Sequence, residues 1–278
     1  MKNKLSQPAL FSAFVLATFA LLGAGRAGAA EEPLPDQLSL RLGGYNVRNA
    51  STIVRRDSAG FPAGAYIDFD ETLGGESTAT VFRFDGLYRF NKHHALGFSW
   101  YSMNFSGSRV LDTSINWGDL TYPVNFQLDS KLEFDVYKLN YQYSLHHDDK
   151  VELGALLGFH VLKTGISLNG FNSGSAVQSS SESVTAPLPV FGLFARYNFT
   201  RQLSVYYNYQ WFFINYEDTV SGGLQDFVLG CEYRLVENVS LGLAYNRFAL
   251  HLKAKDNSST LYLDTNWNGG MLYAGLHF

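Results

Sequence analysis

The feature that most constrains the fold is an alternation of apolar and mixed residues along the last stretch of the chain, 261–278. Leu272, Ala274, Leu276 and Phe278 occupy every second position, and small, polar or aromatic residues stand between them. Side chains of a β-strand point alternately to the two faces of its sheet. The stretch is therefore predicted to be a β-strand with one apolar face and one mixed face.

The same alternation recurs in nine segments upstream, which are separated by connections that are mostly short and long in turn. These predicted strands are 37–49, 78–90, 95–107, 131–145, 151–168, a segment that ends at 199, 203–213, 227–235 and 239–253. The short connections, such as 91–94 and 200–202, have the composition of tight turns, whereas 50–77 and 108–130 are long and polar. Strands of this kind joined by turns predict an all-β protein.

The aromatic carboxyl terminus resembles the C-terminal signature of Gram-negative outer-membrane β-barrels, in which a terminal Phe or Trp is recognised by the barrel assembly machinery. The resemblance implies that Leu276 and Phe278 form the assembly signal and that the cell outer membrane is the location. It also implies outer-membrane lipids, lipopolysaccharide and the assembly machinery as partners. An even number of strands with short turns at one end and longer loops at the other is typical of such barrels.

The expected fold is a closed antiparallel up-and-down transmembrane β-barrel of about ten strands, with eight or twelve as alternatives. A closed barrel can span lipid because it leaves no strand edge with unpaired N–H and C=O groups. Both ends of the barrel domain are then expected on the periplasmic side. The soluble alternative is a lipocalin-like barrel, whose apolar face would point inward around a ligand.

Residues 1–30 have the composition of a cleaved secretory signal peptide, which leaves 31–278 as the barrel domain. Lys2 and Lys4 precede an uncharged apolar run at 9–22, and small residues follow at 28–30. The run is shorter than the ~18 apolar residues of a membrane-spanning helix.

Composition excludes several classes of function. The formal net charge is -4 without a block of like charges, which argues against a nucleic-acid partner. Cys231 is the single cysteine, so no internal disulfide is expected. The sequence has no metal-ligand spacing, phosphate-binding loop or nucleophile motif, so neither a metal nor another cofactor is predicted.

Polar residues on the opposite strand faces define the candidate site, the lumen of the barrel. The predicted lumen-facing charged or titratable residues are Arg41, Arg83, Asp85, Arg89, Lys138, Glu152, His160, Arg196, Glu232 and Arg234. Ten strands leave little lumen, because eight-stranded barrels are about filled by their side chains. Since buried charges must be paired, the set predicts a salt-bridged plug. The excess of cations leaves a narrow porin-like channel for small solutes as the alternative.

An outer-membrane hydrolase is a second alternative, because some barrels of similar size are omptin proteases or lipid A-modifying enzymes. The densest His/Asp cluster, 146–149, falls in a turn predicted at the periplasmic end, away from where omptins act. A rim site of His251, Lys253, Asp256 and Asp264 would satisfy the residue types of acid–base catalysis. Solvated strand ends explain these residues equally well, so no catalytic residue is predicted.

The predicted function is therefore a non-enzymatic barrel with a role in envelope structure or surface interaction, for an unknown ligand. Three local expectations accompany it. The Gly/Ser-rich stretch 169–182 is predicted to be a mobile loop. The connection around 46–77 is long enough to fold over the mouth of the barrel. In 239–253 the apolar residues change phase near Asn246, which predicts a β-bulge.

Overall fold

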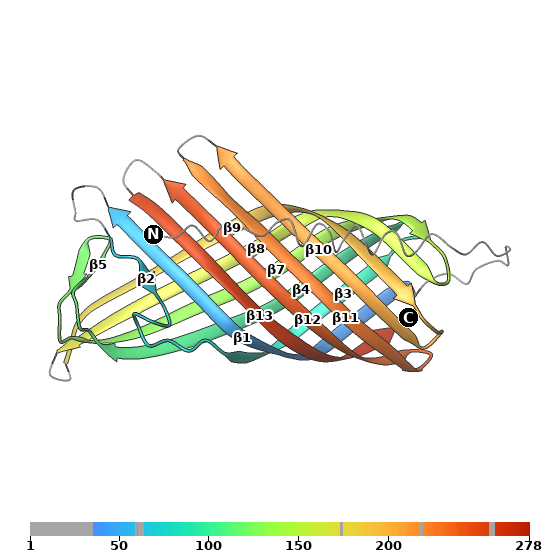
Figure 1. The fold of residues 1–278 in the computed structure, drawn as a ribbon, viewed down its shortest axis with the longest axis horizontal. Helices are drawn as coiled ribbons and strands as arrows, with labels where there is room; N and C mark the ends of the chain where they lie inside the picture. Colours follow the sequence, from blue (N-terminus) through green and yellow to red (C-terminus); the bar gives the residue numbers. More distant parts are fainter. Residues whose placement is uncertain (1–35, 59, 61–63, 173–174, 217–218, 256–258) are drawn as a thin grey trace, which may run out of the picture. The chain divides into compact units, whose positions relative to one another are not determined.

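Ten long antiparallel strands form a closed ring in the computed structural model (Figure 1), which describes residues 36–58, 60, 64–172, 175–216, 219–255 and 259–278. The ring contains β1 (Leu38–Ser58), β3 (Ala79–Arg89), β4 (His94–Val110), β7 (Gln127–His147), β8 (Val151–Asn172), β9 (Ser175–Asn198), β10 (Leu203–Tyr216), β11 (Val220–Val236), β12 (Val239–Lys255) and β13 (Ser259–His277). The predicted barrel of ten strands is confirmed.

The first and last strands of the ring close it. β1 and β13 pair over almost their whole lengths, from Ser39 opposite His277 to Ser58 opposite Ser259. The N–H of Leu38 donates to the carbonyl of Phe278 at 3.0 Å, and the N–H of Phe278 donates back at 2.8 Å. Closure satisfies backbone groups that a lipid environment would leave without partners.

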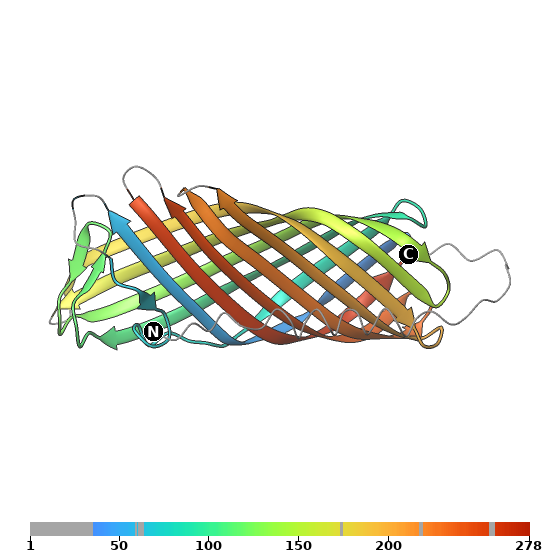
Figure 2. The same ribbon diagram turned by 45° about the horizontal axis from the view of Figure 1, so that its top comes forward.

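The two ends of the barrel differ in their connections (Figure 2). Leu38 and Phe278 lie at the end with short turns, which is the periplasmic end in barrels of this class. At the opposite end, two of the connections are long. They contain the short strands β2 (Ile67–Asp68), β5 (Ile115–Trp117) and β6 (Leu120–Tyr122).

Asn and Asp side chains build two of the short turns. Asn91 Oδ1 accepts hydrogen bonds from two backbone N–H groups, and Asp148 Oδ1 accepts bonds from the N–H groups of Lys150 at 2.8 Å and Val151 at 2.7 Å. Such side chains replace backbone partners in tight turns. Partial burial would raise the pKa of Asp148, but the hydrogen bonds outweigh it and hold this pKa below its ordinary value.

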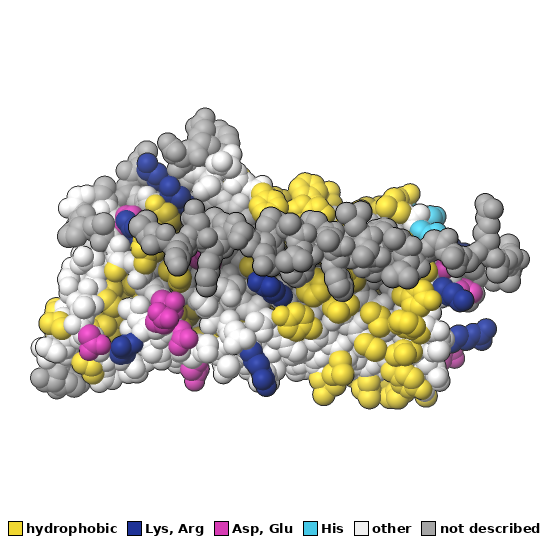
Figure 3. All heavy atoms as spheres, viewed as in Figure 1, with side chains coloured by type: hydrophobic (Ala, Val, Ile, Leu, Met, Phe, Trp, Pro, Cys, Tyr) yellow, Lys and Arg dark blue, Asp and Glu magenta, His cyan; other side chains and the backbone are white. Residues whose placement is uncertain are grey.

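Hydrophobic side chains cover the outside of the barrel toward the short turns (Figure 3). Exposed members of this lipid-facing band include Phe82, Phe90, Leu96, Tyr141, Leu157, Phe159, Phe191, Leu229, Leu241, Leu243 and Leu272. Apolar side chains on the outside of a closed sheet fit a hydrocarbon surrounding and not a soluble lipocalin-like barrel.

The interior changes character along β12, and the predicted bulge near Asn246 is wrong. The register of β12 with β11 and with β13 runs unbroken through Asn246. Ser240 and Asn246 are buried, and so are Phe248 and Leu250 farther along on the same strand face. The apolar residues change phase because the strand leaves the lipid layer: its outside becomes polar while its inside becomes apolar.

A real bulge lies in β1, where the register with β13 shifts between Arg48 and Ser51. Asn49 has a φ of 51°, and the N–H of Ala50 donates to the carbonyl of Ser77 at 2.9 Å. The strand then continues to Ser58. The predicted connection at 50–77 is therefore a strand over its first part, because pairing with β13 overrides its polar composition.

The Gly/Ser-rich stretch 169–182 is likewise not a loop over its described residues. It belongs to β8 and β9, which pair from Val151 opposite Tyr197 to Asn172 opposite Ser175. Cross-strand hydrogen bonds hold the backbone here, and the inward neighbours Ile166 and Leu168 are buried. The predicted loop is therefore wrong over the described residues, since small polar residues are compatible with the solvated face of a sheet.

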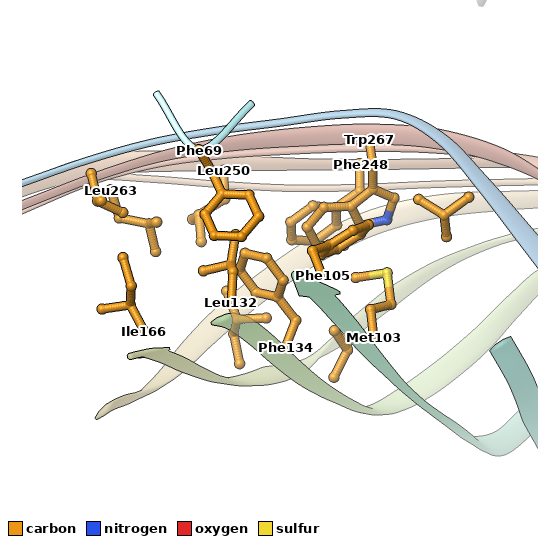
Figure 4. Packing of buried hydrophobic residues seen from close by; sticks show 14 of the residues in the cluster. Phe69, Met103, Phe105, Leu132, Phe134, Ile166, Phe248, Leu250, Leu263 and Trp267 are labelled. Atoms are coloured by element: carbon orange, nitrogen blue, oxygen red, sulfur yellow. The ribbon is translucent and has the colours of Figure 1, made fainter. Parts of the chain in front are cut away.

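A hydrophobic core fills the half of the barrel away from the short turns (Figure 4). Phe248 stacks on Trp267 with 4.1 Å between ring centroids, and Phe134 lies 5.5 Å from Trp267 across the interior. The connections add Ile67, Phe69, Leu73, Leu111, Ile115, Trp117 and Tyr122 to the same cluster. Part of the first long connection thus packs into the hydrophobic core.

The part of the chain that the structure describes contains no helix long and apolar enough to cross a bilayer.

Candidate functional site

The candidate site is the polar layer of the lumen, between the short turns and the hydrophobic core. Of the ten predicted residues, Arg83, Arg89, Lys138, Glu152, His160 and Glu232 are buried. Arg41, Asp85, Arg196 and Arg234 are partly buried. Each side chain comes from an inward position of its strand, and each has a polar partner in the lumen.

Lys138 and Asp226 form the central ion pair of this layer. Lys138 Nζ lies 2.5 Å from Asp226 Oδ2, and the two side chains are 3% and 1% exposed. Their strands, β7 and β11, have β8, β9 and β10 between them in the ring, so the pair spans the lumen. Asp226 also accepts a hydrogen bond from Asn246 Nδ2 at 2.7 Å, and His160 Nε2 lies 2.9 Å from Gln210 Oε1.

Arg83, on β3, is linked to this pair through Asn246 on β12, and β1 and β13 lie between these two strands in the ring. Its guanidinium donates to both oxygens of Asp85 at 3.0–3.1 Å and to Asn246 Oδ1 at 3.0 Å. The same guanidinium lies over the ring of Tyr101, 5.1 Å from its centroid. A planar cation with an acid, an amide and an aromatic ring around it has its hydrogen-bonding capacity largely used.

Glu232 is the centre of a second group closer to the short turns. Arg41 Nε donates to it at 2.8 Å, and Arg196 Nη1 lies 3.6 Å away on another strand. Tyr273 donates to the same carboxylate at 3.0 Å, and His277 Nε2 lies 3.6 Å from it. One buried carboxylate thus connects four strands: β1, β9, β11 and β13.

Two further ion pairs close the layer at the short-turn end. Arg89 binds Glu152 with two nearly parallel hydrogen bonds of 2.8 and 3.1 Å, and Ser144 donates to the same carboxylate at 2.5 Å. Arg234 pairs with Asp36. Bidentate pairs of this geometry are among the strongest hydrogen-bonded contacts in proteins.

Sequence reasoning missed several members of this network. Asp226 was not assigned to a strand face, although it stands two residues before the inward position Val228 on the same alternation. Tyr273 and His277 belong to the mixed face of the last strand, but alternation does not show that they are partners of Glu232. Alternation shows which residues face inward, whereas contacts across the lumen depend on the shear of the barrel.

The arrangement pairs the charges of this layer across the lumen. Every acid named above contacts at least one cation, and the hydrophobic core covers the layer on the side away from the short turns. Breaking such pairs is costly because each partner would remain buried and unpaired.

Of the two His/Asp groups considered for catalysis, the described residues of the rim group lie on the outside of the barrel. His251 Nδ1 is 3.2 Å from Asp264 Oδ2, and both side chains are exposed on β12 and β13. Lys253 lies against the ring of Tyr262, and Asp256 falls outside the described residues. In the turn group 146–149, His146 pairs with Asp148 at 3.0 Å, and His147 Nδ1 lies 3.2 Å from the lumen residue Glu152. No group of three or more potential metal ligands occurs among the described residues.

No protein-family model matches the sequence, and no curated protein is similar to it. Solved structures do match the fold. The outer membrane protease OmpT from Escherichia coli is similar with a TM-score of 0.57 and 10% identity, over 88% of this chain and 98% of that one. The fold is that of a Gram-negative outer-membrane β-barrel.

Two other outer-membrane proteins match with lower TM-scores. OprG from Pseudomonas aeruginosa has a TM-score of 0.38 and 12% identity, over 90% of this chain and 99% of that one. Ail of Yersinia pestis, solved with a heparin analogue, has a TM-score of 0.36 and 13% identity, over 88% and 99%. The lipid-facing band and the closed ring agree with an outer-membrane location.

Proposed function

We propose that this protein is a non-enzymatic outer-membrane barrel with a closed lumen, whose outer half serves surface interaction or envelope structure. The observation that carries the proposal is the Lys138–Asp226 pair, which joins opposite walls of the lumen and is buried on both sides. The aromatic contact of Phe134 with Trp267 crosses the lumen a second time, closer to the outer mouth. An aqueous path would have to displace both.

The outside of the outer half supports the role in surface interaction. Tyr66 and Tyr262 lie 6.0 Å apart between ring centroids, and the Arg55 guanidinium lies 4.7 Å from the centroid of Tyr66. Tyr66 is 59% exposed although it is a large aromatic residue outside the lipid-facing band. Exposed aromatic and Arg side chains are enriched where proteins contact other molecules.

Conductance in a planar lipid bilayer tests the closed lumen. We expect the purified, folded protein to give rare or very small current steps. Large, regular and long-lived openings would contradict the proposal and favour the narrow channel. Silent bilayers together with turnover of lipid A or peptide by the same preparation would favour the outer-membrane hydrolase instead.

A further inference from the structure

Two arginines lie in one row across three strands on the outside of the barrel, at the border of the lipid-facing band. On β13, Asn268 pairs with Arg247 of β12 on one side and with Arg48 of β1 on the other. Both arginine side chains are exposed. Their backbones are two strand spacings apart, about 10 Å, so the two long side chains can reach one ligand between them.

The residues next to the arginines set their height. One step toward the short turns, the outward row is Tyr245, Gly270 and Asn46, and the next row holds Leu243 and Leu272, which are 64% and 63% exposed. Figure 3 shows Lys and Arg side chains at the edge of the hydrophobic field. The arginines therefore stand where lipid headgroups begin.

No acid neutralises the pair among the described residues. Arg48 Nε donates to Asn46 Oδ1 at 2.8 Å, and Asn46 in turn donates to Thr80, which orients the guanidinium without removing its charge. The nearest outward acid on these strands, Asp264, is four residues from Asn268 and pairs with His251. Glu76 precedes Ser77, which bonds the bulge, but no ion pair joins it to either arginine.

The surface below the arginines has room for a hydrocarbon chain. Gly270 and Gly44 are exposed, and a Cβ added to either would meet no atom within 4 Å. They lie diagonally next to each other, between Tyr245 on β12 and Phe82 on β3. The band thus has a bare strip of backbone leading away from the two guanidinium groups.

We propose that Arg48 and Arg247, with Asn268 between them, bind the phosphate of a phosphorylated outer-leaflet glycolipid of the lipid A type. Arginine is suited to this role because its planar fork matches phosphate oxygens. Arg48 takes an outward position in the regular alternation of β1, just before the bulge, and the bare strip at Gly270 and Gly44 accommodates one acyl chain. This site depends on the fold alone and not on closure of the lumen.

The test is a titration of the folded, detergent-solubilised protein with bisphosphoryl lipid A. The readout is the temperature at which half of the protein changes from folded to unfolded migration on a gel. R48Q/R247Q removes the two charges. The matched control, K163Q/R201Q, removes two exposed cations elsewhere. We expect the first variant to bind at least about tenfold more weakly, a loss of about 1.4 kcal/mol in binding free energy, because it loses the charged hydrogen bonds to phosphate. The control should match the unmodified protein.

Equal binding by R48Q/R247Q and the unmodified protein would overturn the site. Equal stabilisation by dephosphorylated lipid A, or by phosphatidylglycerol, would overturn its assignment to a glycolipid phosphate. If R48Q/R247Q does not fold, R48K/R247K replaces it. That variant keeps both charges but loses the planar fork, so binding as tight as in the unmodified protein would also contradict the proposal.

Discussion

At the scale of single residues, this barrel stabilises charge by pairing it across the lumen. Lys138 or Asp226 alone in the interior would lower stability, because an unpaired buried charge is strongly destabilising. Asn246 donates a further hydrogen bond to Asp226, and Arg83 in turn donates to Asn246. The pair is therefore expected to contribute both to stability and to the proposed closure of the lumen.

We predict that Lys138→Met lowers the free energy of unfolding by roughly 3–5 kcal/mol, because it leaves Asp226 buried without its cation. Urea unfolding in lipid vesicles measures the effect. The double variant Lys138→Met with Asp226→Leu should be more stable than Lys138→Met alone. Lys131→Met is the control, since its pair with Glu133 is exposed and contributes at most about 1 kcal/mol. Equal losses at both lysines would contradict this account.

At the scale of elements, β12 shows how one strand serves two environments. Its inward face is polar within the lipid-facing band and apolar beyond it, while its register stays constant. The hydrophobic residues in the first half of β12 therefore face lipid, whereas those in the second half face the core.

Paired substitutions on β12 test this change of environment by urea unfolding. Leu243→Arg should cost roughly 2–4 kcal/mol near the bilayer midplane, whereas Ala244→Ser on the other face should cost little. Beyond Asn246, Leu250→Ala should cost roughly 2–5 kcal/mol because it leaves a cavity in the core. Ala249→Lys, on the solvated face, should be nearly neutral. A costly Ala249→Lys with a neutral Leu250→Ala would mean that the strand does flip.

The closing strand β13 makes its own prediction. Phe278 is 61% exposed at the end of the apolar face, where its backbone bonds Leu38. If this residue is the assembly signal, Phe278→Asp should sharply lower the amount of heat-modifiable protein in outer-membrane fractions. Phe278→Trp should retain it. Unchanged amounts of folded protein after Phe278→Asp would refute the role of this residue.

At the scale of the whole molecule, the asymmetry of the barrel defines its orientation. The short turns lie at one end of the barrel, and the long connections lie at the other. In barrels of this class the short turns face the periplasm. The solvated half, with Tyr66 and Arg55, would then project from the cell.

Epitope tags in the connections check this orientation. A tag inserted at Gly60, an exposed residue between β1 and β2, should be stained by antibody on intact cells. A tag at Asp149, in the short turn after β7, should be stained only after the outer membrane is opened. The reverse staining pattern would show that the short turns face the outside of the cell.

The sequence by itself determined the number of strands, their facing within the lipid layer and the terminal aromatic position. These properties follow from alternation, which is local along each strand. It also placed residues such as Arg41 and Glu232 on inward positions. It did not identify the acid opposite Lys138, because contacts across a lumen depend on the shear of a closed ring.

Only the tertiary structure decided what happens beyond the lipid layer. There the sheet continues with an apolar interior, so apolar residues such as Phe248 and Leu250 face inward and not toward lipid. The alternation in the sequence therefore changes phase although the register of the strand does not. The real bulge at Arg48 and the strand pairing of 169–182 were hidden for a related reason. Backbone hydrogen bonds to a neighbouring strand, and not local composition, hold these segments extended.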